Sequence, residues 1–414
     1  MKLQRYLRLF LIGVLCFVMT ISLQAQDPSS TTDTFYFISY IVENEDYQSF
    51  HYSTISPNAR YVAGISLLNS ATINVHIWDN TNLLSSNQSN LDDPVFIIPD
   101  PNHTIQIDIG VTIEDINTEM NILRIPLAFS HSTQYLAIRI YNQVFILTTD
   151  TWDILTQITI PLTQVRDLTW LGDEMLLFSG NQLVAIDWMN DVIYSNSSMG
   201  DASVYTINDM WLIAGVRPPA PTFQVCTLNL ETCEIYEGYG KVNAVHESGL
   251  VATWGLLDPQ EGFNNPILWH CEALRCSQRQ DYSTSFDSEF RPIGFNSSGT
   301  LLYGLPDIFQ SLYEIWNLDD MNSVMSYEAT TIQSEWFNDS TFIVNETPRF
   351  TVYTLDASDP IYTFDLTPFE TFAEENNVYL PEARSIDVAY HAEENRCWVL
   401  RDWAYSALLF SFSC

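Results

Sequence analysis

The chain has 414 residues, and 16 Lys or Arg stand against 51 Asp or Glu, so the formal net charge is −35 at pH 7. A surface this acidic repels nucleic acid and anionic lipid, which excludes both as partners held through charge. The length allows one large closed β domain or two smaller ones.

Residues 1–25 have the pattern of a secretory signal peptide. Three basic residues precede the apolar run 9–23, which is too short to span a membrane comfortably, and Ala25 ends an acceptable cleavage site. An uncleaved anchor is the alternative. We expect cleavage, no membrane insertion afterwards, and a secreted, periplasmic or cell-surface protein. Loss of the three basic residues takes the charge from −35 to −38 and leaves Lys241 as the one lysine.

Residues 26–34 read as a flexible tail, and Phe35–Val42 reads as a strand with no hairpin partner beside it. From Ser53 onward one pattern returns: an apolar run, a polar turn of two to four residues, a second apolar run and an alternating third strand. The copies begin at Ser53, Leu127, Leu168, Val204, Val242, Ile293, Ser334 and Asp387. Short strands repeating every 40–50 or so residues predict an all-β fold, a β-propeller of four-stranded blades. Eight blades fit best and seven is the alternative.

The copies resemble WD40-type repeats, most clearly in SPNARYVAGIS with INVHIWD and in FNSSGTLLYG with YEIWNLD. The resemblance covers nearly all of residues 35–414, which it implies to be one propeller domain. Trp78-Asp79 closes a third strand in register, and Trp316-Asn317 is a near match. The Gly-His pair that opens a regular WD40 blade is absent throughout.

The last copy has only three strands before the chain stops at Cys414. We expect Phe35–Val42 to supply its missing outer strand and so to close the ring, because an open sheet edge invites aggregation. A stray edge strand is the alternative. The long interval between the first two copies should hold the fourth strand of blade one at Pro94–Pro99, and the rest of it, including Thr104–Glu114, reads as an insertion.

Six cysteines follow the leader, an even number that predicts disulfides in a secreted chain. The repeat register places Cys226 with Cys233, Cys271 with Cys276, and Cys397 with Cys414 in antiparallel hairpins. Opposed residues in such hairpins have Cα atoms within disulfide reach. Metal binding is the weaker alternative, since no C-x-x-C pair is present.

Loops between second and third strands lengthen in blades four to six. They are Arg217–Thr222, Leu256–Pro266 and Leu305–Gln310. Proline lowers the entropy cost of holding a loop ready for a partner, so Arg217, Pro218, Phe263 and Phe309 are candidate binding residues on one face. Neutral drift in loop length is the alternative.

No hydrolase, nucleotide-binding or metal motif is present in the sequence, and its seven His residues are scattered. We therefore expect no catalytic residues, no cofactor and no metal. Two functions remain, because propellers host many activities. The favoured one is a non-catalytic, monomeric scaffold for a protein or peptide, with a basic partner favoured by the charge. The alternative is an extracellular carbohydrate-active propeller, either a glycoside hydrolase or a lectin.

Overall fold

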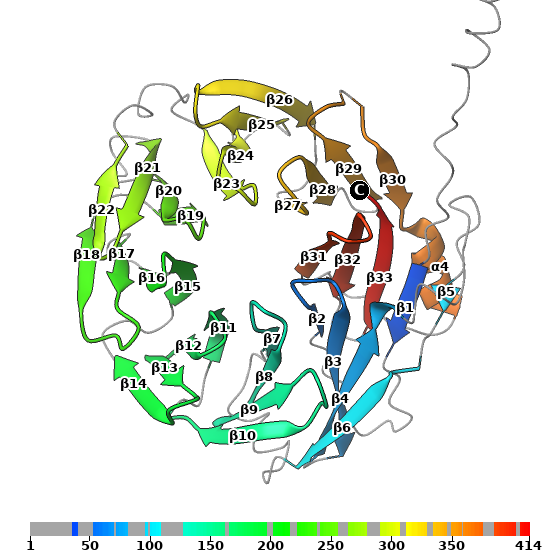
Figure 1. Cartoon of the computed structure of the whole chain (residues 1–414). Helices are drawn as coiled ribbons and strands as arrows, with labels where there is room; N and C mark the ends of the chain where they lie inside the picture. The colour runs from blue at the N-terminus through cyan, green and yellow to red at the C-terminus, as the bar shows by residue number, and fades with distance from the viewer. Residues whose placement is uncertain are drawn as a thin grey trace, which may run out of the picture.

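The structure is a computed structural model. It describes residues 35–39, 53–69, 72–81, 96–97, 100–108, 127–161, 165–196, 202–215, 222–237, 241–255, 264–279, 290–306, 312–328, 334–345, 349–357, 359–375, 385–402 and 406–414. Within them the chain forms strands β1 to β33 and the helix α4, arranged as eight sheets around one axis (Figure 1).

Each sheet is one blade, and its strands are given from the axis outward. Blade 1 contains β2 (Ser53–Ile55), β3 (Tyr61–Asn69), β4 (Thr72–Asp79) and β6 (His103–Asp108). Blade 2 contains β7 (Leu127–Phe129), β8 (Tyr135–Ile140), β9 (Gln143–Thr148) and β10 (Ile154–Thr159). Blade 3 contains β11 (Val165–Leu171), β12 (Met175–Gly180), β13 (Leu183–Asp187) and β14 (Val192–Asn196). Blade 4 contains β15 (Ala202–Ile207), β16 (Met210–Gly215), β17 (Thr222–Cys226) and β18 (Cys233–Glu237).

The second half of the ring follows the same order. Blade 5 contains β19 (Lys241–Val245), β20 (Leu250–Gly255), β21 (Asn264–Glu272) and β22 (Arg275–Gln278). Blade 6 contains β23 (Arg291–Phe295), β24 (Leu301–Leu305), β25 (Leu312–Asn317) and β26 (Asn322–Glu328). Blade 7 contains β27 (Ser334–Trp336), β28 (Thr341–Asn345), β29 (Arg349–Thr354) and β30 (Tyr362–Asp365). Blade 8 contains β31 (Ser385–His391), β32 (Arg396–Asp402), β33 (Ser406–Ser413), β1 (Phe35–Ser39) and β5 (Phe96–Ile97).

The middle strands are apolar almost throughout because both faces of every blade are covered by a neighbour. In β3, Val62 packs toward blade 8 with Trp398, whereas Ala63 and Ile65 pack toward blade 2. Eight such clusters of buried side chains exist, one for each junction between neighbouring blades. The core is therefore itself a closed ring, and the prediction of eight blades is confirmed.

The N-terminal strand closes this ring, as expected from the missing strand of the last copy. β1 pairs antiparallel with β33 in a register that opposes Phe35 to Phe410 and Ser39 to Ser406. The two ends of the propeller thus share one sheet, and the blade-8 edge that β33 would leave open is covered.

The expectation for the fourth strand of blade one was wrong. That strand is β6, which pairs with β4 along its whole length, so residues 103–108 are not part of an insertion. Ile107 of β6 is buried in the junction with blade 2, which holds the strand there. The segment expected to fill the place contributes β5, which instead pairs parallel with β1 and covers the outer edge of blade 8.

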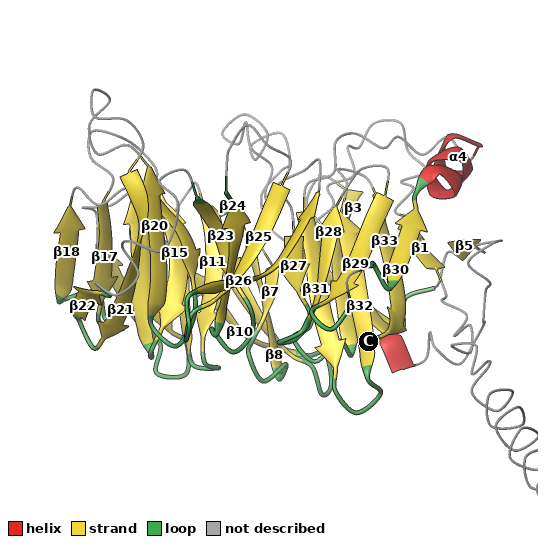
Figure 2. Cartoon of the chain, turned by 90° about the horizontal axis from the view of Figure 1, so that it is seen from above, coloured by secondary structure: helices red, strands yellow, loops and turns green. Residues whose placement is uncertain are grey.

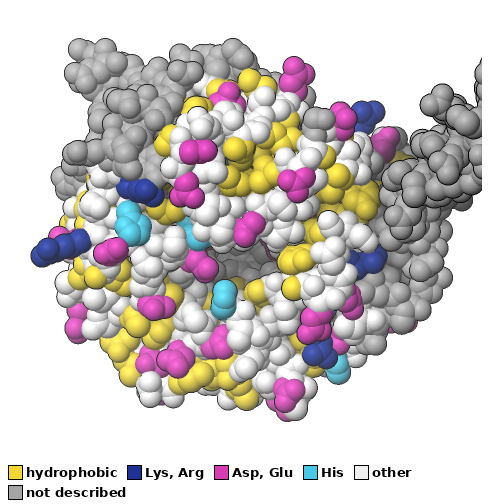
Figure 3. All heavy atoms as spheres, turned by 45° about the horizontal axis from the view of Figure 1, so that its top comes forward, with side chains coloured by type: hydrophobic (Ala, Val, Ile, Leu, Met, Phe, Trp, Pro, Cys, Tyr) yellow, Lys and Arg dark blue, Asp and Glu magenta, His cyan; other side chains and the backbone are white. Residues whose placement is uncertain are grey.

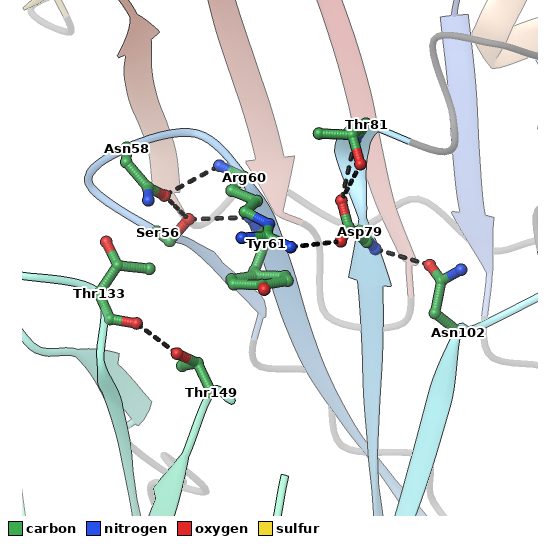
Figure 4. A network of polar contacts seen from close by, with 9 residues as sticks. All are labelled: Ser56, Asn58, Arg60, Tyr61, Asp79, Thr81, Asn102, Thr133 and Thr149. Atoms are coloured by element: carbon green, nitrogen blue, oxygen red, sulfur yellow. Dashed lines mark hydrogen bonds and ion pairs between the residues drawn. The ribbon is translucent and has the colours of Figure 1, made fainter. Parts of the chain in front are cut away.

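The polar turns between the first and second strands of blades 1, 2 and 6 share one hydrogen-bond geometry, drawn for blade 1 in Figure 4. The Ser56 Oγ atom accepts the Tyr61 N–H at 2.9 Å, and the Ala59 N–H donates to the Ser56 carbonyl at 2.8 Å. Ala59 then takes a left-handed φ of 59°. Asp79 ends β4 beside this turn, 3.5 Å from the Arg60 guanidinium, and it accepts two hydrogen bonds from Thr81. The residues that carry the WD40 resemblance therefore stabilise a turn.

Ala59 is the fourth residue of this turn, counted from Ser56. The corresponding residues of blades 2, 5 and 6 are Thr133, Gly249 and Gly299, and all have positive φ. Glycine tolerates this conformation without the roughly 1–2 kcal/mol cost that a Cβ atom imposes. Gly249 also packs so closely against the Cys271 carbonyl that a Cβ atom has no room there.

These turns are joined from blade to blade. The Asp173 carboxylate of blade 3 accepts the Ser132 N–H of blade 2 at 3.2 Å, and Asp339 of blade 7 accepts the Ser297 hydroxyl of blade 6 at 3.1 Å. His246 of blade 5 donates from Nε2 to the Ser297 carbonyl at 2.9 Å. The end of the ring that carries these turns, called the turn face, is thus cross-linked by hydrogen bonds (Figure 2, lower edge).

Three disulfides and one helix complete the described structure. Cys226–Cys233 and Cys271–Cys276 join directly opposed residues of the outer hairpins of blades 4 and 5, and Cys397–Cys414 joins β32 to the residue after β33. These are the three pairs expected from the repeat register. Helix α4 (Thr367–Glu375), which was not expected, follows blade 7 and buries Phe369 in the blade 7–8 junction.

Candidate functional site

The four candidate binding residues, Arg217, Pro218, Phe263 and Phe309, lie outside the described residues. The strand ends that flank their loops are described, and they lie at the end of the ring opposite the turn face. This end is called the loop face. Their role in binding stays a prediction, and the geometry that follows comes from the described residues beside them.

A cavity of about 180 Å³ lies at the loop-face ends of the innermost strands of blades 4, 5 and 6. Its polar lining comes from Ser203 and Tyr205 of β15, Lys241 and Asn243 of β19, and Arg291 of β23. Its second wall includes Gly215, which directly precedes the segment that contains Arg217 and Pro218. The cavity therefore includes the last residue of the strand that leads, in sequence, to one of the predicted loops.

Two cations meet at this cavity in a chain that has few. Lys241 is exposed, and Arg291 is half-buried with its guanidinium carbon 5.5 Å from the centre of the Trp254 ring. The Asn243 amide donates to the Pro292 carbonyl at 3.1 Å, which links the blade 5 and blade 6 walls. Burial raises the pKa of the Tyr205 hydroxyl, so it stays protonated and able to donate. The polar part of the lining thus consists of groups that can donate hydrogen bonds.

Acidic side chains lie on the inner strands of the next two blades around the channel. Glu335 of β27 and Asp387 of β31 lie on the innermost strands of blades 7 and 8. Burial and, as the smaller effect, the neighbouring Asp387 carboxylate together raise the pKa of Glu335 to about 7. Glu335 is exposed, whereas Asp387 is half-buried.

Asp387 experiences the same desolvation. Burial raises its pKa to about 6, and a hydrogen bond with Thr54 of β2 opposes that shift. The inner strands of blades 7 and 8 therefore each place one carboxyl group on the channel wall, and Thr54 of blade 1 hydrogen-bonds to the second. We call Glu335 and Asp387 the acidic pair. Near neutral pH its carboxyl groups take up and release protons.

Sequence reasoning missed this pair because the two residues are far apart in the chain and acidic residues are common in it. One signal was available. Glu335 stands two residues before the turn residue Phe337, as Thr54 stands two residues before Ser56. Superposing the copies on their turns would have placed Glu335 at the position of Thr54, whereas Asp387 lies near the start of β31 and carries no such signal.

Two of the described histidines have structural roles. His76 is half-buried and hydrogen-bonded to Ser66 and Thr104, and burial lowers its pKa to about 4. His246 lies in the turn after β19 and bridges blades 5 and 6. Among the residues that the structure describes, no three His, Cys, Asp or Glu side chains are grouped as metal ligands.

Figure 3 shows a hollow at the axis of the ring, with Asp and Glu side chains spread over the visible face and Lys and Arg near its outer edge. This distribution follows from the excess of acidic residues in the chain. In the part of the chain that is described, no helix is long and apolar enough to cross a membrane. Residues 1–25, the expected signal peptide, lie outside that part.

No protein-family model matches this chain, and no curated protein matches its sequence. Solved structures do resemble it. Sqt1 of Saccharomyces cerevisiae is 10% identical, with 93% of this chain and 100% of that chain covered and a TM-score of 0.55. Hsv2 of Kluyveromyces lactis is 8% identical, with 69% and 98% covered and a TM-score of 0.43. Similarity at this identity concerns the fold, and by its fold and its repeats the chain is an eight-bladed WD40-like β-propeller.

Proposed function

We propose that this chain is an extracytoplasmic, non-catalytic scaffold that holds a basic protein or peptide at its central channel. The observation that carries the proposal is the acidic pair on adjacent inner strands of a chain with a net charge of −35. A channel wall that concentrates negative charge attracts a Lys or Arg side chain, and the surrounding acidic surface speeds the encounter.

The raised pKa values make this binding dependent on pH. A cationic side chain binds the ionised acidic pair, so it must displace any proton that Glu335 or Asp387 holds. With pKa values of about 7 and about 6, the pair is mostly ionised at pH 8 and mostly protonated at pH 5.5. Affinity for a basic ligand should therefore increase as the pH rises between these limits.

The test uses an acetylated and amidated Gly-Arg repeat octapeptide as probe, with the matching Gly-Gln peptide as its uncharged counterpart. Calorimetry at pH 5.5 and pH 8 should show binding of the Arg peptide alone, tighter at pH 8 and weaker in high salt. Glu335→Gln should weaken binding at pH 8 by up to about fivefold, the range of a solvent-accessible ion pair. The double change with Asp387→Asn should abolish the pH dependence.

Glu328→Gln is the matched control, because it removes one carboxylate from the exposed outer strand of blade 6. It should change the affinity by the general charge effect only and leave the pH dependence intact. Equal losses in Glu328→Gln and Glu335→Gln would remove the acidic pair from the proposal and leave only non-specific attraction.

The candidate loops give a second test of the scaffold. The predicted loop Leu256–Pro266 ends inside β21, which begins at Asn264, so the trim is confined to residues 256–263. Replacing them with a short turn should abolish capture of the partner recovered by pull-down from the source organism's envelope and medium. The fold should survive, since each doubling of loop length changes closure by only about 0.6 kcal/mol. Phe263→Ala tests the aromatic anchor, whose loss typically costs about 2 kcal/mol. Unchanged capture by both variants would return these loops to neutral drift.

Secretion and assembly state belong to the same proposal. N-terminal sequencing of protein from the culture medium should begin at Gln26, and light scattering should give a monomer that does not bind DNA. Intact mass at full length in the membrane fraction would support the uncleaved anchor instead.

One observation favours the carbohydrate-active alternative. Two carboxyl groups that are electrostatically coupled and retain protons near neutral pH are the chemical elements of general acid and base catalysis on glycosides. A glycan array with a glycosidase screen decides between the functions. Turnover that is lost in Glu335→Gln would identify this propeller as an enzyme, whereas no signal in either assay would favour the scaffold.

A further inference from the structure

The cavity at blades 4 to 6, named here the donor cavity, is a second site of opposite charge to the acidic pair. It is formed by the ends of β15, β16, β19 and β23, so no single repeat contains it. Its volume is about 180 Å³, whereas one water molecule needs roughly 10–15 Å³. There is room for a small organic group and its hydration.

The donors in its wall suit an oxyanion. The Lys241 ammonium supplies a point charge, and the Arg291 guanidinium supplies a planar fork that matches a carboxylate. The Trp254 ring, 5.5 Å from the guanidinium carbon, lies against this fork and limits its freedom. The Ser203 and Tyr205 hydroxyl groups, which hydrogen-bond to each other, leave one neutral donor on the opposite wall.

The remaining lining decides which oxyanion fits. Ala214, Val242, Pro292 and Ile293 give the cavity an apolar side, which suits a ligand whose charged group is attached to a short aliphatic body. The net charge of −35 opposes every anion that approaches, and it opposes a dianion about twice as strongly as a monoanion. A singly charged carboxylate therefore fits better than a phosphate ester.

We propose that the donor cavity binds an aliphatic carboxylate, through Lys241 and Arg291 with the apolar side holding the carbon chain. The group has two possible sources: a free short-chain acid, or the C-terminal carboxylate of a peptide that ends in a small apolar residue. The proposal does not depend on the acidic pair or on a basic partner. Failure of either site would leave the other in place.

Nuclear magnetic resonance titration of the full chain tests it with four probes: isobutyrate, acetyl-Ala-Val with a free carboxylate, acetyl-Ala-Val amide, and inorganic phosphate. We expect both carboxylates to saturate one site, with the amide at least about tenfold weaker, because a charge-assisted hydrogen bond is worth that much. Tighter binding of acetyl-Ala-Val than of isobutyrate assigns the site to peptide C-termini. Tighter binding of isobutyrate assigns it to free acids. Phosphate binding at least as strong as either carboxylate would overturn the assignment.

The variants separate this cavity from general charge effects. Lys241→Gln should weaken both carboxylates by up to about fivefold, because Lys241 is exposed. Arg291→Lys should weaken them less than Arg291→Gln, because it keeps the charge and loses the fork. Arg275→Gln is the control, since it removes one positive charge from the exposed outer strand of the same blade. Lys241 is exposed, so its variant should fold normally, which circular dichroism checks. Equal affinity in Lys241→Gln and in the wild type, or equal losses in Lys241→Gln and Arg275→Gln, would refute the site.

Discussion

Blade 4 and blade 8 have the same inner-to-outer order of four antiparallel strands, yet the chain builds them differently. Blade 4 is one continuous meander over residues 202–237. Blade 8 takes three strands from the C-terminus and β1 from the far N-terminal side, with β5 added outside. Each also has a disulfide. The comparison shows that all blade junctions can pack alike although the chain closes the ring in only one blade, blade 8.

The largest expected effect comes from breaking blade 8 at its seam. Deletion of residues 35–39 removes β1 and exposes the edge of β33, so the ring loses its closure and gains an aggregating edge. We expect a fall in Tm on the order of 10 °C or more, together with aggregation, in a thermal scan followed by light scattering.

The matched control deletes residues 27–34, which precede β1 and should leave Tm unchanged. If both deletions melt like the full chain, β1 is dispensable and blade 8 is closed without it. The comparison with blade 4 would then lose its basis.

The disulfides of blade 8 and blade 4 give the next comparison. Cys397 and Cys414 are separated by 17 residues and join the blade that closes the ring, and such a loop is worth about 3 kcal/mol in the chain-entropy treatment. The double variant Cys397→Ala/Cys414→Ala should lower the free energy of unfolding by about that amount, measured by denaturant titration. Alanine is the choice because Cys397 is fully buried and a serine there would need a partner.

The blade 4 bridge should matter less. Cys226 and Cys233 are separated by 7 residues, and their strands are already paired directly. Cys226→Ala/Cys233→Ala should cost about 2 kcal/mol or less, by the same titration. A loss larger than that of the blade 8 variant would mean that the outer hairpin of blade 4, and not the seam, limits stability.

The smallest effect concerns the acidic pair at the junction of blades 7 and 8. Both pKa values are raised from ordinary values of 4.5 and 3.8, so between about pH 4 and pH 7 the folded chain holds more protons than the unfolded chain. Stability from this source is greatest below pH 4 and is lost as the pH rises through 6 and 7.

Glu335→Gln removes the ionisation. It should raise Tm by about 1–2 °C at pH 8 and change it little at pH 4.5, as a calorimetric scan can measure. An exposed carboxylate such as Glu328 serves as control, and its Gln variant should show no such dependence on pH. An equal shift at both pH values would mean that Glu335 affects stability by packing.

Much of this architecture could be predicted because the signals are local. Each turn and its two strands lie within about twenty residues, so the copies, the eight blades and the hairpin cysteines could be recognised one repeat at a time. The closing strand could be inferred as well, because a three-stranded last copy and an unpaired first strand leave only one economical pairing.

The places where prediction failed depend on contacts between distant segments. Residues 94–99 and 103–108 are both short and partly apolar, and only packing against blade 2 selects β6 as the outer strand of blade 1. The acidic pair joins residues 335 and 387, and the donor cavity joins three blades. The repeat determines a strand's neighbours within its blade, since backbone pairing is set by local turns. Which side chains of different blades lie together depends on the closed ring, because the packing of neighbouring blades places their inner strands around one channel.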